Sequence, residues 1–101
     1  MKILTTALAV ITLSASASAN AEVSKYDFCY AHSELSESVM TARQGGVSMR
    51  DAIEAVMGDE IAIAIIQDAY EVPGYSTAEF QQKAILEFSD LIYAECLSLF
   101  D

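Results

Sequence analysis

The last quarter of the chain carries a pattern that a long amphipathic helix explains best. Ser76 and Glu79 have the three-residue spacing of a capping box, and Tyr75 and Phe80 occupy the two positions of a hydrophobic staple around it. Apolar residues then recur at steps of three and four, which gives a helix one broad apolar face. They are Phe80, Ala84, Ile85, Phe88, Leu91, Ile92, Cys96 and Leu99. The sequence therefore predicts a final helix capped by Ser76.

Residues 1–21 have the layout of a secretory signal peptide. Lys2 gives a positive start, residues 3–13 are apolar apart from threonines, and the small, polar residues that follow end in Ala19-Asn20-Ala21. We expect cleavage after Ala21, or alternatively after Ala19, and export to the periplasm or secretion. An uncleaved anchor is the alternative. Because the apolar run is too short to span a bilayer comfortably, we expect no stable membrane insertion after cleavage.

The two cysteines lie near opposite ends of the exported part of the chain, residues 22–101. That length suffices for one small domain, and small extracytoplasmic domains often need a covalent link to support a limited core. Because the number of cysteines is even and the compartment is oxidising, we predict one disulfide between Cys29 and Cys96. Two free thiols are the alternative.

A first helix is predicted from Ser24, which with Asp27 forms a weaker capping box. Its apolar residues have helical spacing; they are Phe28, Ala31, Leu35, Val39 and Ala42. Ser36 is expected on the polar side. Gly45 and Gly46 can adopt the left-handed conformation that ends a helix.

Two shorter helices are predicted next. Ser48 caps the first of them, which ends at Gly58, and Asp59 caps the second, over residues 60–71. Alternating isoleucines at positions 61, 63 and 65 would also suit a strand. We interpret the segment as a helix because the intervening residues are alanines and no second strand could pair with it. Pro73-Gly74 separates it from the final helix.

Together these elements predict an all-α fold, a compact array of about four helices in a single domain over residues 22–101. If the first and last helices run antiparallel, the start of one lies beside the end of the other. Cys29 and Cys96 occupy those two ends, so the predicted disulfide and the predicted topology agree.

The chain is strongly acidic, with a formal net charge of −10 at pH 7. After loss of Lys2, only Lys25, Arg43, Arg50 and Lys83 oppose fifteen Asp and Glu residues. Such a charge makes nucleic acids and anionic lipid surfaces poor partners and attracts a basic protein. The alternative is that the acids only keep a small, hydrophobic protein in solution.

The sequence offers little for catalysis or metal binding. His32 is the only histidine, and the spacing Cys29-x-x-His32 supplies half of a metal site, two of whose three soft ligands a disulfide would remove. No phosphate-binding loop, nucleophile elbow or zinc signature is present. We predict no catalytic residues, no metal and no cofactor. Carboxylate pairs of helical spacing are interpreted as solvated faces; they are Glu34 with Glu37 and Asp51 with Glu54.

The stretch between the last two helices is the candidate binding segment. Tyr70, Val72 and Tyr75 flank Pro73-Gly74, and tyrosine suits binding surfaces because it combines a large ring with a polar tip. The alternative is structural. In that interpretation Tyr75 packs against the start of the final helix, and Tyr70 closes the preceding helix onto it.

Three motifs give the chain a resemblance to known proteins. They are Ala42-Arg43-Gln44-x-Gly46-x-Ser48, Tyr75-Ser76-Thr77-x-Glu79-x-Gln81-x-x-Ala84-Ile85-x-Glu87-Phe88 and Tyr93-x-x-Cys96, together with Cys29. With these the chain resembles small exported, two-cysteine helical proteins of bacteriophages and their bacterial hosts, which are mostly uncharacterised. The resemblance implies an exported, disulfide-linked helical domain without an assigned reaction. A fainter similarity in size, helicity and cysteine spacing is to the periplasmic acid-stress chaperones.

These observations favour a small exported protein that acts by binding, and not by catalysis. The specific hypothesis is an inhibitor or neutraliser of a basic periplasmic or secreted protein, such as a cell-wall lytic enzyme. The alternatives are an acid-stress chaperone and an enzyme that uses carboxylates alone.

Overall fold

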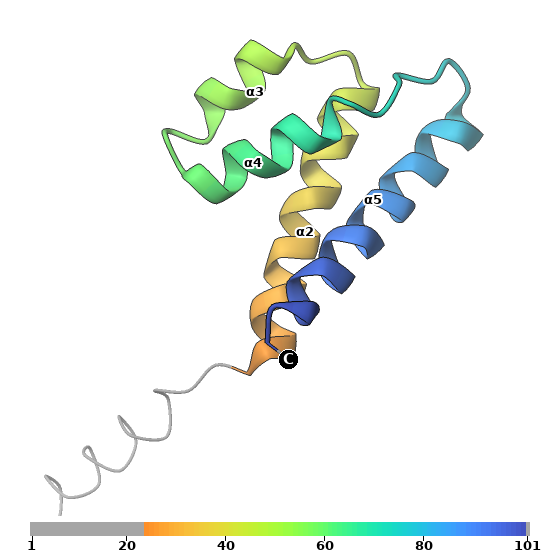
Figure 1. Cartoon of the computed structure of the whole chain (residues 1–101). Coiled ribbons are helices and arrows are strands. Elements are labelled where there is room, and N and C mark those ends of the chain that lie inside the picture. Colours follow the sequence, from red (N-terminus) through yellow and green to blue (C-terminus); the bar gives the residue numbers. More distant parts are fainter. Residues whose placement is uncertain (1–23, 101) are drawn as a thin grey trace, which may run out of the picture.

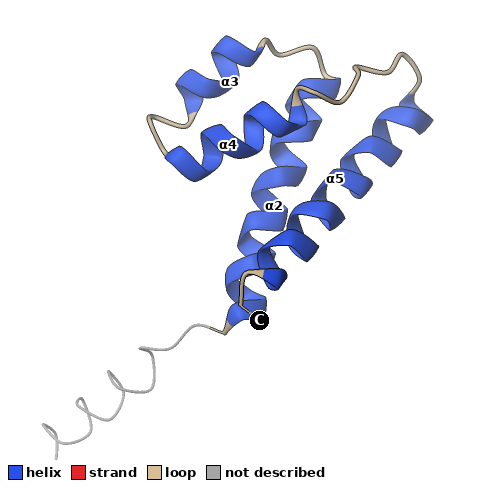
Figure 2. Cartoon of the chain, in the orientation of Figure 1, coloured by secondary structure: helices blue, strands red, loops and turns tan. Residues whose placement is uncertain are grey.

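The computed structural model describes residues 24–100, and the predicted signal peptide lies outside the described residues. Four helices form the described part: α2 (Lys25–Gln44), α3 (Met49–Ala55), α4 (Glu60–Ala69) and α5 (Ala78–Ser98). No strand occurs among residues 24–100, so the predicted all-α class is confirmed (Figure 2). Helices α2 and α5 run antiparallel, α4 packs against α2, and α3 packs against α4 (Figure 1). None of the helices in this part of the chain is long and apolar enough to cross a membrane.

Three of the four predicted helix starts are confirmed by their caps. The hydroxyl of Ser24 accepts a hydrogen bond from the Asp27 amide at 3.1 Å, and Ser48 caps α3 through the Asp51 amide at the same distance. The Asp59 carboxylate accepts from the amides of residues 61 and 62 at 3.0 and 3.2 Å. Each cap gives a partner to an amide that the first helical turn leaves unpaired.

The predicted cap of the last helix is wrong by one residue. Thr77, not Ser76, caps α5, and its hydroxyl accepts from the Phe80 amide at 3.4 Å. The two adjacent hydroxyls are chemically equivalent caps, and the preceding loop decides between them. The Gln81 side chain donates to the Tyr75 carbonyl at 2.7 Å, which fixes where the helix begins. The predicted contact of Tyr75 with Phe80 is present, with ring centroids 6.0 Å apart.

The core lies where α4 crosses the α2–α5 pair. Met40 and Ile66 are almost completely buried at its centre. The other members of the cluster are Val39, Ile65, Ala69, Ala84, Phe88 and Ile92. Helix α3 has no fully buried residue and covers one edge of this cluster with partly buried apolar side chains.

The buried stripe of α2 differs from the expected one. Phe28 and Ala31 are exposed, whereas Cys29, Ser36 and Met40 are buried and face the rest of the fold. The disulfide requires Cys29 to face α5. The buried side of α2 is therefore turned relative to the side on which its apolar residues were expected to lie. Ser36 is 0% exposed because its hydroxyl donates to the His32 carbonyl at 2.8 Å, so its only polar side-chain group has a partner.

The apolar face of α5 is only partly covered. Ala84, Phe88, Ile92 and Cys96 are buried as expected, but Phe80, Leu91 and Leu99 are exposed. Of the residues predicted to form the apolar face, these last three are not covered by the rest of the fold. Helix α2 covers one side of α5 and α4 contacts little of it, so the broad stripe extends beyond the area that its neighbours can bury. The uncovered apolar residues line two grooves on the surface.

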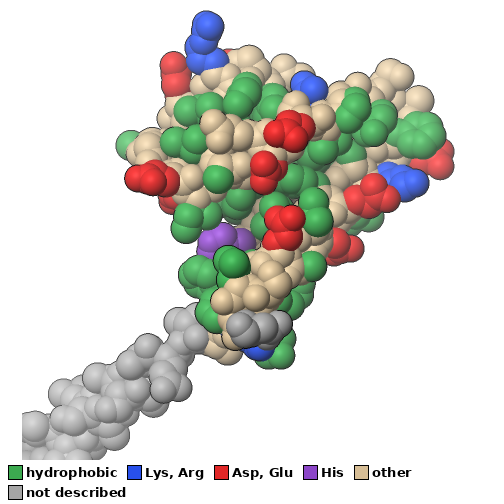
Figure 3. All heavy atoms as spheres, viewed as in Figure 1, with side chains coloured by type: hydrophobic (Ala, Val, Ile, Leu, Met, Phe, Trp, Pro, Cys, Tyr) green, Lys and Arg blue, Asp and Glu red, His purple; other side chains and the backbone are tan. Residues whose placement is uncertain are grey.

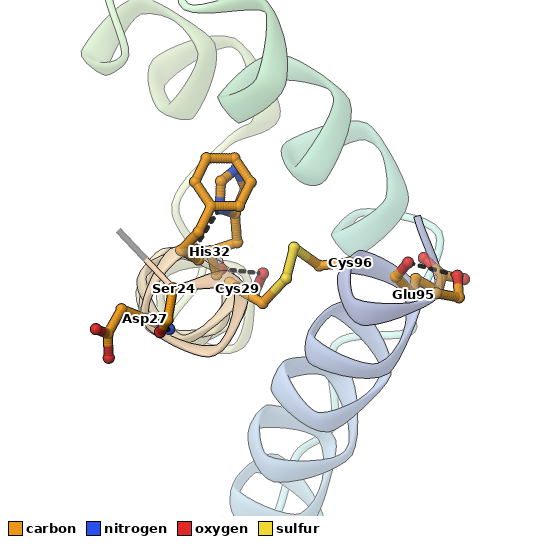
Figure 4. The surroundings of a disulfide bond; sticks show 9 residues. Ser24, Asp27, Cys29, His32, Glu95 and Cys96 are labelled. Atoms are coloured by element: carbon orange, nitrogen blue, oxygen red, sulfur yellow. Dashed lines mark hydrogen bonds between the residues drawn. A yellow bond between two sulfur atoms is a disulfide. The ribbon is translucent and has the colours of Figure 1, made fainter. Parts of the chain in front are cut away.

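The predicted disulfide is confirmed. Cys29 and Cys96 reach toward each other from the start of α2 and the end of α5 (Figure 4), with the sulfur atoms 2.07 Å and the Cα atoms 5.5 Å apart. No free cysteine remains among the described residues. The bond joins the start of α2 to the end of α5.

Candidate functional site: two apolar grooves

The loop between α4 and α5 is fastened to the end of α2. The Gln44 side chain donates to the Pro73 carbonyl at 2.9 Å and accepts from the Tyr75 amide at 2.8 Å. The Arg43 guanidinium donates to the Val72 carbonyl at 3.0 Å. Since Gln44 is itself buried, the loop has a fixed course across the top of the α2–α5 pair.

The structure separates the three predicted binding residues. The Tyr70 hydroxyl donates to the Val47 carbonyl at 2.7 Å, and the Arg43 guanidinium lies 5.1 Å from the centre of its ring. Tyr70 therefore has a structural role at the α2–α3 connection. Val72 and Tyr75, in contrast, line one groove with α5. That these two residues bind a partner stays a prediction.

The groove beside α5 is called here the α5 groove. Its volume is about 400 Å³, and its lining residues are Val72, Tyr75, Phe80, Lys83, Ala84, Glu87, Phe88 and Leu91. Among the described residues, the charged ones that line it are Lys83 and Glu87, which lie one helical turn apart and form an exposed ion pair with 4.0 Å between nitrogen and oxygen. Its charge is therefore balanced, unlike that of the chain.

A second groove lies at the disulfide-linked end of the molecule, between the start of α2, α4 and the end of α5. Its volume is about 660 Å³, and we call it the terminal groove. Ile65, Ile92 and Cys96 form a buried floor, while Ile61 and Leu99 are exposed on its walls. Leu99 is 83% exposed, more than a packed leucine in a small domain would be.

Three acidic side chains line the terminal groove beside its apolar floor. Glu60 and Asp68 come from α4 and Glu95 from α5, and all three are exposed. Among residues 24–100, no lysine or arginine lines this groove. The space-filling view shows the same mixture, with acidic side chains among hydrophobic ones over much of the visible face (Figure 3). An apolar surface flanked by carboxylates attracts a ligand that is both apolar and cationic.

One wall of the terminal groove is held by aromatic contacts. The rings of Phe28 and His32 have centroids 4.5 Å apart, and Phe28 also contacts Phe100 edge to face at 5.9 Å. His32 Nδ1 lies 2.9 Å from the Phe28 carbonyl, which places an N–H donor at this nitrogen. These contacts orient the ring of His32, and Cys29, which shares the Cys-x-x-His spacing with it, is bonded to Cys96.

No three His, Cys, Asp or Glu side chains within residues 24–100 converge in a way that could hold a metal ion. The two grooves offer apolar area, a few charges and, at the α4–α5 loop, a wall fixed by hydrogen bonds.

Sequence reasoning missed the terminal groove. One signal for it was present, because α4 is apolar almost all round and its four isoleucines cannot all face one core. Ile65 is buried and Ile61 is exposed on the groove wall. Which isoleucine would be left outside depends on how α4 crosses α2, which no local pattern specifies.

Comparisons of the chain with protein-family models, with curated proteins and with solved structures find no match.

Proposed function

We propose that this chain is an exported, non-catalytic binding protein whose partner is a basic protein, docked in the terminal groove. The observation that carries the proposal is the combination, in one groove, of an apolar floor, the carboxylates of Glu60, Asp68 and Glu95, and no lining lysine or arginine among the described residues. The net charge of −10 adds a long-range attraction toward the same class of partner.

An amphipathic helical segment with basic flanks is the partner element that fits this groove best. Helix-in-groove recognition places an apolar stripe of the ligand on an apolar floor, here Ile65 and Ile92. Lysine or arginine side chains beside that stripe would pair with the carboxylates at the rim. The apolar contact then supplies most of the affinity, and the charges speed association.

The predicted signal peptide and the resemblance to exported phage and host proteins support an extracytoplasmic target. A basic cell-wall lytic enzyme is the specific candidate, with the chain acting as its inhibitor or neutraliser.

The test measures binding of the disulfide-linked chain to a basic cell-wall hydrolase by calorimetry, and inhibition of that hydrolase in a cell-wall lysis assay. The groove variant is E60Q/D68N/E95Q. The matched control is E34Q/E37Q/E54Q, which removes the same charge from side chains that do not line the groove.

We expect binding at physiological salt that weakens as salt rises, since the exposed charges become screened. The groove variant should lose roughly ten- to a hundredfold in affinity, because three rim pairs of about 0.5–1 kcal/mol each sum to about 1.5–3 kcal/mol, and the control should lose much less. Equal losses in the two variants would show that charge acts without a site. Absence of binding at physiological salt would refute the proposal for this enzyme class.

A further inference from the structure

We propose that the α5 groove is a self-association surface, in which α5 of a second copy of this chain packs antiparallel against α5. This surface is separate from the terminal groove and carries no part of the proposed function. Phe80 and Leu91 lie exposed along it, and Tyr75 forms part of its wall. An exposed apolar stripe along a long, regular helix is a common docking surface for another helix.

The order of residues on this face fits a two-fold axis. The α5 positions that line the groove, 80, 83, 84, 87, 88 and 91, are symmetric about the point between Ile85 and Leu86. When two copies of α5 pack antiparallel about that point, Phe80 of each copy lies opposite Leu91 of the partner subunit. An isologous contact of this kind closes on itself and produces a dimer.

The charges of the face are complementary to themselves. The same arrangement brings Lys83 of each copy beside Glu87 of the partner subunit, so that two intermolecular pairs can replace the two exposed intramolecular ones. If this face carried only acidic residues, like charges would face each other across the two-fold axis. Lys83 is the only basic residue of α5, and it lies on this face.

The middle of the stripe allows the helices to approach. Ala84 is small and buried at the bottom of the groove, and Phe88 is packed into the core beneath it. Small side chains at a crossing point reduce the distance between helix axes. Val72 and Tyr75, held by the hydrogen bonds of the loop to α2, form a fixed wall beside the incoming helix.

The net charge makes the salt dependence of this contact diagnostic. Bringing two copies of a chain with charge −10 together costs repulsion, which added salt screens. Salt should therefore strengthen the dimer, whereas it weakens binding of a basic partner in the terminal groove. The two proposals can fail independently, because one concerns the mass of the chain alone and the other concerns a mixture.

The first test is analytical ultracentrifugation of the disulfide-linked chain from micromolar to millimolar concentration, at low and high salt. Leu91→Asp is the disruptive variant. Leu86→Asp is its matched control, since both leucines are 51% exposed on the same helix and Leu86 lies outside the groove. We expect a dimer that salt promotes, that L86D retains and that L91D loses.

The second test distinguishes an intermolecular pair from the intramolecular one. K83E and E87K each place like charges across the two-fold axis, and each should weaken the dimer roughly tenfold. A mixture of K83E with E87K should form heterodimers as tightly as the unmodified chain forms homodimers, because opposite charges then face each other at both positions. If Lys83 and Glu87 paired only within one subunit, mixing K83E with E87K would restore nothing, because each variant would still lack its own pair.

Three results would overturn the inference. They are a monomer at every concentration and salt tested, equal behaviour of L86D and L91D, and no recovery in the K83E and E87K mixture.

Discussion

Replacing Gln44 with methionine should detach the α4–α5 loop while keeping the length and burial of the side chain. Gln44 is 8% exposed and makes two long-range contacts, a donated hydrogen bond to the Pro73 carbonyl and an accepted one from the Tyr75 amide. The Pro73 carbonyl and the Tyr75 amide are only part-buried. After the substitution, water can therefore replace part of the hydrogen bonding that these two groups lose. Counting about 1–1.5 kcal/mol for each, the free energy of unfolding should fall by about 2–3 kcal/mol.

The matched control is Gln81→Met. Gln81 makes one hydrogen bond, to the Tyr75 carbonyl at 2.7 Å, in an exposed setting, so the expected loss is about 0.5–1 kcal/mol. Urea unfolding followed by far-UV circular dichroism measures both variants, with the slope against urea expected to stay unchanged. For a domain of this size, the Gln44 variant should melt roughly 10–20 °C lower.

The hydrogen-bond reasoning would be wrong if Q44M retained wild-type stability to within about 0.5 kcal/mol, or if Q81M lost as much as Q44M. Because Gln44 also fixes the wall of the α5 groove, Q44M should weaken self-association as well.

Three further predictions follow from the core, the disulfide and the placement of the acids. Replacing Cys29 and Cys96 together with alanine should lower the free energy of unfolding by about 4 kcal/mol, from the loop-closure entropy of a 67-residue separation, and urea unfolding of the variant measures it; an unchanged midpoint would contradict this. Met40→Ala should cost about 2–5 kcal/mol because Met40 is 0% exposed, whereas Met57→Ala, at a position 91% exposed, should change stability by less than about 0.5 kcal/mol. At pH 3 the chain should keep its helical circular dichroism and bind no more of a hydrophobic dye than at pH 7. The reason is that no acidic residue is buried among residues 24–100, where the buried polar residues are Ser36, Gln44 and Ser89. Strong dye binding at pH 3 would instead favour the acid-stress chaperone.

Helix starts could be predicted from the sequence because capping is local. Ser24, Ser48 and Asp59 each satisfy amides two or three residues further on, and no distant part of the fold changes that. The cap of α5 was misplaced because Ser76 and Thr77 offer equivalent hydroxyls. A side chain from within the helix, Gln81, decides between them through the loop.

Burial could be predicted less well because it depends on what the neighbours cover. Cys29 had to face α5, which left Phe28 outside and drew Ser36 inside. The grooves depend in the same way on the crossing of α4. Val72 and Tyr75 were singled out from the residue types around Pro73-Gly74. That Lys83 and Glu87 line the same groove needed the three-dimensional arrangement.

The disulfide also determines what a protease can achieve. Cys29 and Cys96 enclose all of α3 and α4 and most of α2 and α5 in one covalent ring. A single cut in the exposed stretch around Pro73 would therefore release no fragment, and both pieces would stay tethered with α2 beside α5. Such a nicked chain would gain only the mass of one water molecule and would separate into two peptides only after reduction. A protein built in this way can be cut once and remain a single molecule.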